Sequence, residues 1–283
     1  MRSFLAFLLG LLALVCTAVA VPTLWTERNL VDETGYVALA EPLGRDPAFK
    51  KILAQTMTES VVDDSGLSAK TRAAVRPVVL QGARSVVELN RFPAAWTESN
   101  RRTHQFWFGE PGRTPTQADR LVVDVSPLAA LVADQLPAGV RSTVTVPRQA
   151  LVVVGGSEER RAIQRLEVLD PWSYWIGAGA VLFAVGAALL ARRRSAAALW
   201  LGIGTLVVAA ALKGAAVLGA PILAERASSA SRLGARLEDA LRETAEASFD
   251  RWLLVVAAIG LVLAVVGAVG RLVSARRERA PAG

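Results

Sequence analysis

The sequence predicts an α-helical membrane protein with four transmembrane helices and a mainly helical α+β extracytoplasmic domain. Three observations predict this class. Long apolar runs recur along the chain, and each is close to the ~20 residues that cross a bilayer as a helix. Arginine-rich segments flank or separate these runs. Between the first and second runs lies the polar stretch 26–170, which is of common domain size and large enough for a core of its own.

The clearest of these features is a hairpin centred on Arg192-Arg193-Arg194. Residues 172–191 carry no charged side chain, and residues 195–224 carry only Lys213. In hydrocarbon every backbone N–H and C=O must be paired within its own segment, so both runs are expected to be helices. Short arginine-rich loops stay in the cytoplasm, so the triple arginine determines the orientation of both helices. The predicted transmembrane hairpin is 171–224, with its turn at 192–195 and both outer ends extracytoplasmic.

The first apolar run, residues 4–24, is interpreted as a retained membrane anchor within 1–25. The alternative is a signal peptide, because Ala18-Val19-Ala20 fits the small-residue rule for cleavage. Trp25 favours retention, since it stands where an interfacial aromatic residue belongs. Cys16 is the only cysteine, so a disulfide framework is excluded and a small buried side chain is expected.

The net charge of +7 follows from membrane topology. Acids and bases balance within 26–170. The excess comes from the proposed cytoplasmic segments, which hold Arg2, Arg192, Arg193, Arg194, Arg271, Arg276, Arg277 and Arg279 against Glu278. A nucleic-acid partner therefore loses its main support, and no nucleic-acid binding is expected.

The first half of 26–170 is predicted to be helical. Asp46 before Pro47 is a typical N-cap and first helical residue, and Ser68 marks a second helix start. That second helix is expected to be interrupted near Pro77, and Pro93 is expected to restart or kink the next one.

The most distinctive sequence pattern in the chain is a stripe of four aromatic and polar residues. Phe92, Trp96, Asn100 and His104 are spaced by four, so they share one helix face. One hypothesis makes Trp96, Asn100 and His104 a possible interaction stripe, with His104 catalytic or pH-sensing. The favoured interpretation is a hydrogen-bonded helix contact capped by aromatics. His104 is the only histidine, and with no second thiol or imidazole ligand no metal site is predicted.

The second half of 26–170 is predicted to mix strands and helix. Residues 121–125, 142–146 and 151–154 are expected to be strands, with a short helix at 126–136. Gly155-Gly156 precedes a helix start, which resembles a phosphate loop. Acidic residues follow at once and would repel phosphate, so the pair is interpreted as a turn, and no cofactor is predicted.

Beyond the hairpin, residues 225–250 are predicted to be an extracytoplasmic amphipathic helix. Its apolar face contains Leu233, Leu237, Leu241 and Phe249, and it is expected to dock on the main domain or on a partner. Residues 251–273 form the fourth span and 274–283 a basic cytoplasmic tail, which places both termini in the cytoplasm. Lys213 is the one charge within the spans. It is expected to extend to the outer interface, without an acidic partner in another span.

Several features in this order are similar to a known family. They are the segment 34–37 leading to Pro42-Leu43 and Asp46-Pro47, the residues Trp96, Asn100 and His104, the step from strand to helix at 122–128, the arginine-rich hairpin, and Phe249-Asp250. Together they resemble a family of uncharacterised actinobacterial integral membrane proteins. The resemblance implies the same four-helix topology. It implies no activity and no catalytic residues, because none is established for the family.

The function that the sequence favours is a non-enzymatic, multi-pass protein of the cell membrane. Its extracytoplasmic domain is expected to bind or scaffold another component of the cell envelope, with an envelope protein and the lipid bilayer as partners. A subunit of a transporter or channel is the first alternative, because intramembrane charges such as Lys213 often mark transport paths. The second alternative is a membrane-anchored enzyme that uses His104 or one of the acidic residues Glu110, Asp124 and Asp134.

Overall fold

The computed structural model describes residues 2–63, 66–108, 120–141, 150–158, 160, 161, 163, 170–226 and 232–279. The chain divides into two compact units. The first, here called the membrane unit, comprises residues 1–27, 168–225 and 246–283. The second, here called the globular unit, comprises residues 28–167 and 226–245.

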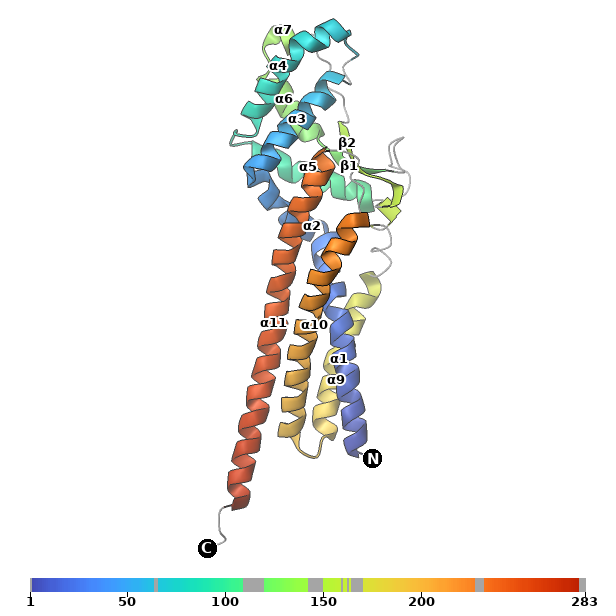
Figure 1. Ribbon diagram of the computed structural model, residues 1–283, viewed down its shortest axis with the longest axis vertical. Helices are drawn as coiled ribbons and strands as arrows, with labels where there is room; N and C mark the ends of the chain where they lie inside the picture. The colour runs from blue at the N-terminus through green and yellow to red at the C-terminus, as the bar shows by residue number, and fades with distance from the viewer. Residues whose placement is uncertain are drawn as a thin grey trace. The chain divides into compact units, whose positions relative to one another are not determined.

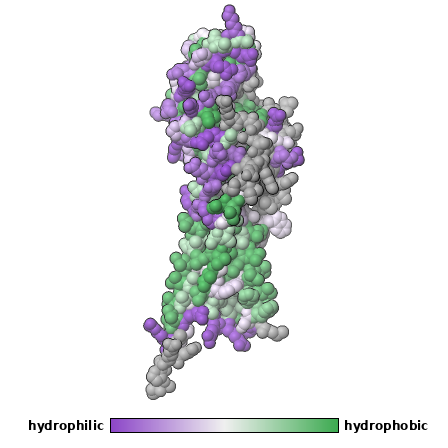
Figure 2. All heavy atoms as spheres, in the orientation of Figure 1, coloured by the Kyte–Doolittle hydropathy of each residue, from purple (hydrophilic) through white to green (hydrophobic). Residues whose placement is uncertain are grey.

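Long apolar helices make up the membrane unit (Figure 1). They are α1 (Arg2–Thr26), α9 (Asp170–Leu190), α10 (Arg194–Arg226) and the greater part of α11 (Arg232–Arg279). Within the described residues, four helices are long and apolar enough to cross a membrane, as the sequence predicted. Figure 2 shows their hydrophobic residues as a continuous green band. These helices indicate a multi-pass α-helical membrane protein.

Small residues hold α10 and α11 together in the membrane unit. A Cβ atom added to Gly202 of α10 would lie 2.3 Å from the backbone nitrogen of Ala264 in α11. A Cβ atom on Gly267 of α11 would lie 2.3 Å from the backbone nitrogen of Leu199. Lipid tails are as apolar as leucine, so helices in a bilayer associate through such close van der Waals contact rather than by excluding water.

Short helices form the first half of the globular unit (Figure 1). In chain order they are the π-helical turn η1 (Glu27–Val31), α2 (Glu33–Ala40), the 3-10 turn η2 (Glu41–Arg45), α3 (Pro47–Asp63), α4 (Ala69–Val86) and α5 (Phe92–Phe108). The predicted caps are confirmed: Asp46 Oδ1 accepts from the Ala48 N–H at 2.8 Å, and Ser68 Oγ accepts from the Thr71 N–H at 3.3 Å. Pro93 lies in the first turn of α5, where its missing N–H costs nothing.

Among the described residues, the second half of the globular unit contains one two-stranded sheet. The strands are β1 (Leu121–Asp124) and β2 (Leu151–Gly155), which pair antiparallel with Asp124 opposite Leu151. Between them lie α6 (Ser126–Gln135) and α7 (Ala138–Arg141). The strand predicted at 142–146 lies outside the described residues. Ser126 does not cap α6; its hydroxyl accepts from the Ala150 N–H and so joins the start of α6 to β2.

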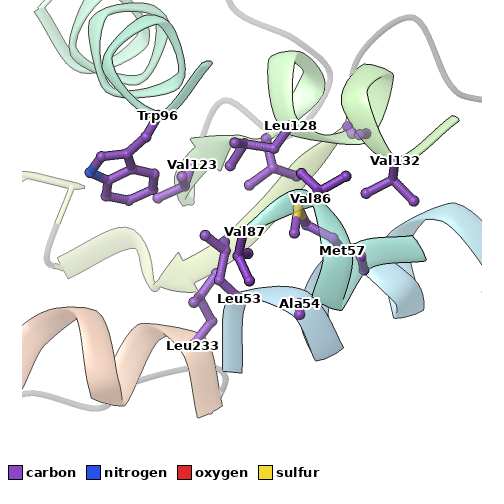
Figure 3. Close-up of a cluster of buried hydrophobic side chains, with 14 of the residues drawn as sticks. Leu53, Ala54, Met57, Val86, Val87, Trp96, Val123, Leu128, Val132 and Leu233 are labelled. Carbon is purple, nitrogen blue, oxygen red and sulfur yellow. The ribbon is translucent and has the colours of Figure 1, made fainter. Parts of the chain in front are cut away.

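The core of the globular unit draws on both segments of the chain that form it. Leu53 and Met57 of α3 and Leu128 of α6 are fully buried in it (Figure 3). Leu233 and Leu237, from the beginning of α11, are 2% and 5% exposed in the same cluster. The segment before the last span therefore docks on the main domain, which is one of the two contacts that its apolar face predicted.

One predicted helix interruption is wrong. The helix α4 continues through Pro77, where an interruption was expected. The carbonyl that loses its N–H partner belongs to Ala73, and both Ala73 and Pro77 are exposed, so water can reach this carbonyl. The amphipathic helix predicted at 225–250 and the span predicted at 251–273 follow one another without a break in α11, which runs from residue 232 to 279. A change from a polar to an apolar environment does not require a break in backbone hydrogen bonding, because the helix satisfies its own N–H and C=O groups in both.

Candidate functional site

The predicted stripe lies on α5 and points into the core of the globular unit. Trp96, Asn100 and His104 are 2%, 2% and 5% exposed. Trp96 Nε1 donates a hydrogen bond to the Ala40 carbonyl at 3.0 Å, and Asn100 Nδ2 donates to the Trp96 carbonyl at 2.8 Å. His104 Nε2 lies 2.9 Å from the Val31 carbonyl oxygen and donates to it. In this conformation the stripe offers little surface to a partner and serves as a hydrogen-bonded helix contact.

Aromatic rings enclose His104. Its ring centroid lies 5.4 Å from that of Tyr36 and 4.7 Å from that of Phe108. Burial lowers the pKa of His104 below its ordinary value of 6.5, although the Val31 carbonyl and the nearby Glu33 carboxylate oppose the shift. The imidazole is therefore neutral at pH 7. Burial also raises the pKa of Tyr36, which keeps its hydroxyl protonated.

A second face of α5, absent from the sequence predictions, supplies polar partners to the edge of β1. Trp107 Nε1 donates to the Val122 carbonyl at 2.9 Å, and Thr103 Oγ1 accepts from the Asp124 N–H at 3.0 Å. The Ser99 hydroxyl donates to the Asp124 carbonyl. These three side chains, here called the α5 ladder, bind the backbone edge of β1 in a two-stranded sheet whose other described strand is β2. The spacing of four between Ser99, Thr103 and Trp107 is the signal that could have revealed it.

The acidic residues considered for catalysis have different surroundings. Asp124 is 3% exposed, and its Oδ1 accepts from the Ser126 N–H at 2.8 Å, which fixes the turn into α6. Asp134 is exposed on α6, and Glu110 lies outside the described residues. Among the residues that the structure describes, no group of three or more His, Cys, Asp or Glu side chains is placed to hold a metal ion.

The arginines predicted to determine topology lie at the turn between α9 and α10. Arg192 and Arg193 separate the two helices, and Arg194 begins α10. All three are exposed. The hairpin turn therefore lies at the predicted position in the chain.

Lys213 has an acidic partner, which lies just outside the predicted fourth span. Its Nζ lies 2.6 and 2.7 Å from the two carboxylate oxygens of Asp250. Asp250 immediately precedes the predicted fourth span, 251–273, so the prediction for the spans did not include it. Lys213 is 19 residues beyond Arg194, or roughly 28 Å along α10, which places the pair near the end opposite the arginine turn. Near the end of a span, an ion pair avoids the high cost of burying charge at the bilayer centre.

Aromatic residues accompany this pair. Trp25 Nε1 donates to Ser248 Oγ at 3.3 Å, and the Trp25 and Phe249 rings meet edge to face at 5.6 Å. Trp172 and Trp175, near the beginning of α9, are exposed. Indole rings with one polar and one apolar side suit the boundary between lipid and water.

Compared with known proteins, the chain matches no family model, no curated protein and no solved structure.

Proposed function

We propose that this chain is a non-enzymatic membrane protein of the cell envelope whose globular unit lies outside the cytoplasm and binds or scaffolds another envelope component. The observation that carries the proposal is the shared core of the globular unit. Residues 28–167 and 226–245 belong to different loops between spans, yet they bury side chains in one hydrophobic cluster. The chain passes between this unit and the membrane helices four times, so the unit stays attached to the membrane at several points. Such attachment is consistent with a domain that binds or scaffolds a partner at the membrane.

The shared core also supports the proposed topology. Two loops can form one core only if both emerge on the same side of the membrane, as the first and third loops of a four-span protein do. The arginine turn is then on the opposite side, together with both ends of the chain. Because short arginine-rich loops stay in the cytoplasm, the globular unit is extracytoplasmic.

Cysteine labelling tests this orientation. In a Cys16→Ser background, Ala74→Cys introduces a thiol on the exposed side of α4, and Ser274→Cys introduces one near the end of α11. A membrane-impermeant maleimide applied to intact cells is expected to label the first variant and not the second. Permeabilised cells should label both. Labelling of residue 274 in intact cells, with none at residue 74, would refute the orientation.

The outer face of α4 is the surface that we propose for partner binding. Ala74, Pro77 and Val78 are exposed there, and Val78 is the one exposed large hydrophobic residue in the described part of the globular unit. Lys70 and Arg84 are exposed near the two ends of the helix, which contains no acidic residue. A partner with an apolar patch flanked by carboxylates would complement this face.

Photo-crosslinking in native membranes tests the binding proposal. A photoreactive residue at Ala74 is compared with one at Ala130, an exposed alanine of matched size on α6. A discrete crosslinked species from position 74, with none from position 130, is expected. The absence of any crosslinked protein from either position would contradict the binding function. A product from position 130 alone would contradict the choice of α4.

A transporter or channel subunit is the second candidate, and the contact between Lys213 and Asp250 favours it. An ion pair near the end of a span can open a transport path for solutes or ions when it breaks. If the pair controls flux, Lys213→Ala should change solute or ion leakage in reconstituted vesicles, and Asp250→Asn should produce the same change. Unchanged flux in both variants removes this candidate.

A further inference from the structure

A cavity of about 380 Å³ lies at the arginine end of the membrane unit, among α1, α9 and α10. Its size is within the usual range of small-molecule sites. Small residues from each of the three helices line it, and they include Ala6, Gly10, Ala187 and Ala197. Larger side chains at these positions would close the space, so the cavity follows directly from their small volume.

Two aromatic rings form the apolar part of the lining. The rings of Phe7 and Trp200 lie 5.2 Å apart between centroids, and both side chains are partly exposed. A Cβ atom at Gly10 would lie 2.7 Å from the Trp200 ring, so the glycine provides the room in which this ring lies across α1. The cavity thereby has an aromatic wall suited to a hydrocarbon chain.

Positive charge lies at the edge of the same cavity. Arg192 and Arg193 both line it and both are exposed. Neither forms an ion pair with any of the residues that the structure describes. Two guanidinium groups without a carboxylate partner, next to an apolar cavity, complement a molecule with an anionic head and an apolar tail.

We propose that this cavity binds one anionic phospholipid from the leaflet on the arginine side of the membrane. The phosphate of the lipid lies on Arg192 and Arg193, and part of one acyl chain lies against Phe7 and Trp200. A zwitterionic lipid has the same tail but no net negative charge, so its head gains less from the two arginines. The charge complementarity favours an anionic lipid whichever side of the membrane is cytoplasmic.

Native mass spectrometry of the full-length protein in detergent tests the head-group contact. With added phosphatidylglycerol, one tightly bound lipid per chain is expected, and phosphatidylcholine should bind at least tenfold more weakly. Replacing both cavity arginines, in Arg192→Gln/Arg193→Gln, should weaken phosphatidylglycerol binding roughly 30-fold, since each arginine contributes about 1 kcal/mol and 1.4 kcal/mol is tenfold. The control Arg271→Gln/Arg276→Gln removes the same charge from α11, outside the cavity lining, and should change binding less than about threefold.

A second pair of variants tests the acyl-chain contact. Ala197→Leu places a larger side chain in the cavity and should reduce phosphatidylglycerol binding at least tenfold. Gly214→Leu adds the same side chain to α10 where a Cβ atom meets nothing within 4 Å, and should leave binding unchanged. Glycerol phosphate, which has the head group without the chains, should not displace the lipid.

Three results would overturn the proposal. Equal binding of phosphatidylglycerol and phosphatidylcholine to the unmodified protein would show that no anionic head is recognised. Equal losses of phosphatidylglycerol binding in the Arg192/Arg193 and Arg271/Arg276 double variants would show general charge attraction instead of a specific site. Displacement by glycerol phosphate at the affinity of the lipid itself would identify a phosphate site with no role for the cavity.

Discussion

Gly234 is the residue that permits α11 to lie close to β2. A Cβ atom there would lie 2.4 Å from the carbonyl oxygen of Val154 and 3.1 Å from its Cα. Both obstacles are backbone atoms, which cannot rotate away as a flexible side chain can. The close approach is therefore available to glycine alone unless the helix shifts.

Gly234→Ala should destabilise the globular unit by about 1–2 kcal/mol. The overlap costs more than the ~1 kcal/mol that alanine gains over glycine in a helix. The measurement is thermal or denaturant unfolding of the purified protein. The control is Gly139→Ala in α7, where a Cβ atom meets nothing within 4 Å, and it should have no effect or stabilise slightly. Similar unfolding midpoints for both variants would contradict the close contact.

His104 is expected to make stability depend on pH below about 6.5. Burial lowers the pKa of His104 in the folded state below its ordinary value of 6.5, so the unfolded state binds the proton more readily. The contribution of the neutral His104 side chain to stability is therefore fully present above about pH 6.5. It is lost as the pH falls from there toward the folded-state pKa. The loss cannot exceed about 1.4 kcal/mol per pH unit for one proton.

The slope of unfolding free energy against pH between 7 and 5.5 measures this effect. His104→Phe removes the titrating group, so its slope should be flatter than that of the unmodified protein even if its absolute stability is lower. Because His104 is the only histidine, no other side chain has an ordinary pKa in this range. Parallel slopes in the two proteins would mean that His104 is not buried as a neutral group.

At the scale of elements, the α5 ladder is the contact that holds β1 in place on the side away from β2. Thr103→Val keeps the shape of the side chain but leaves the buried Asp124 N–H without its acceptor. An unpaired buried donor costs about 1–3 kcal/mol, so the globular unit should lose that much stability. Thr97→Val changes an exposed residue of the same helix and should have little effect. Equal stability of the two variants would exclude a structural role for the ladder.

Helix starts were predictable from sequence because they depend on a few neighbouring residues. Asp46 and Ser68 cap the helices that they were expected to cap. The expected break at Pro77 was wrong because the cost of a proline depends on whether the freed carbonyl reaches water, which only the fold decides.

The site was less predictable than the elements. The spacing of four correctly placed Trp96, Asn100 and His104 on one face, but periodicity does not distinguish a buried face from a groove. Ser99, Thr103 and Trp107 share the same spacing, which places them on one helix face, but the spacing does not identify their partners, because these are backbone atoms of β1. Asp250 lies 37 residues from Lys213, so local reasoning could not pair them.

At the scale of the whole molecule, the two loops of the globular unit should unfold together. Leu233 is 2% exposed in a core otherwise built mainly from residues before 168. Leu233→Ala leaves a cavity there and should cost about 2–5 kcal/mol. Limited proteolysis should then cleave the variant faster within residues 28–167. Leu254→Ala, at a position of α11 that is 69% exposed, is the control and should be cleaved at the rate of the unmodified protein. Unchanged proteolysis of the Leu233 variant would show that the loops fold separately.

The four spans were predictable because the bilayer imposes the same requirement of length and apolarity on every spanning helix. The sequence predicted that the apolar face of residues 225–250 docks either on the main domain or on a partner, so the joint core was only one of two possibilities. Which surface covers Leu233 and Leu237 depends on contacts between residues far apart in the chain, and amphipathic periodicity carries no information about them.

The shared core also has a consequence for the order of synthesis. The core needs Leu233 and Leu237, which leave the ribosome only after α9 and α10 have been made. About 70 residues separate the end of the first segment at 167 from Leu237. At 5–20 residues per second, the first loop waits roughly 4–14 s for its last core side chains. The globular unit therefore reaches its final packing only after the hairpin has begun to insert, and during that interval its unfinished core is exposed to chaperones and proteases.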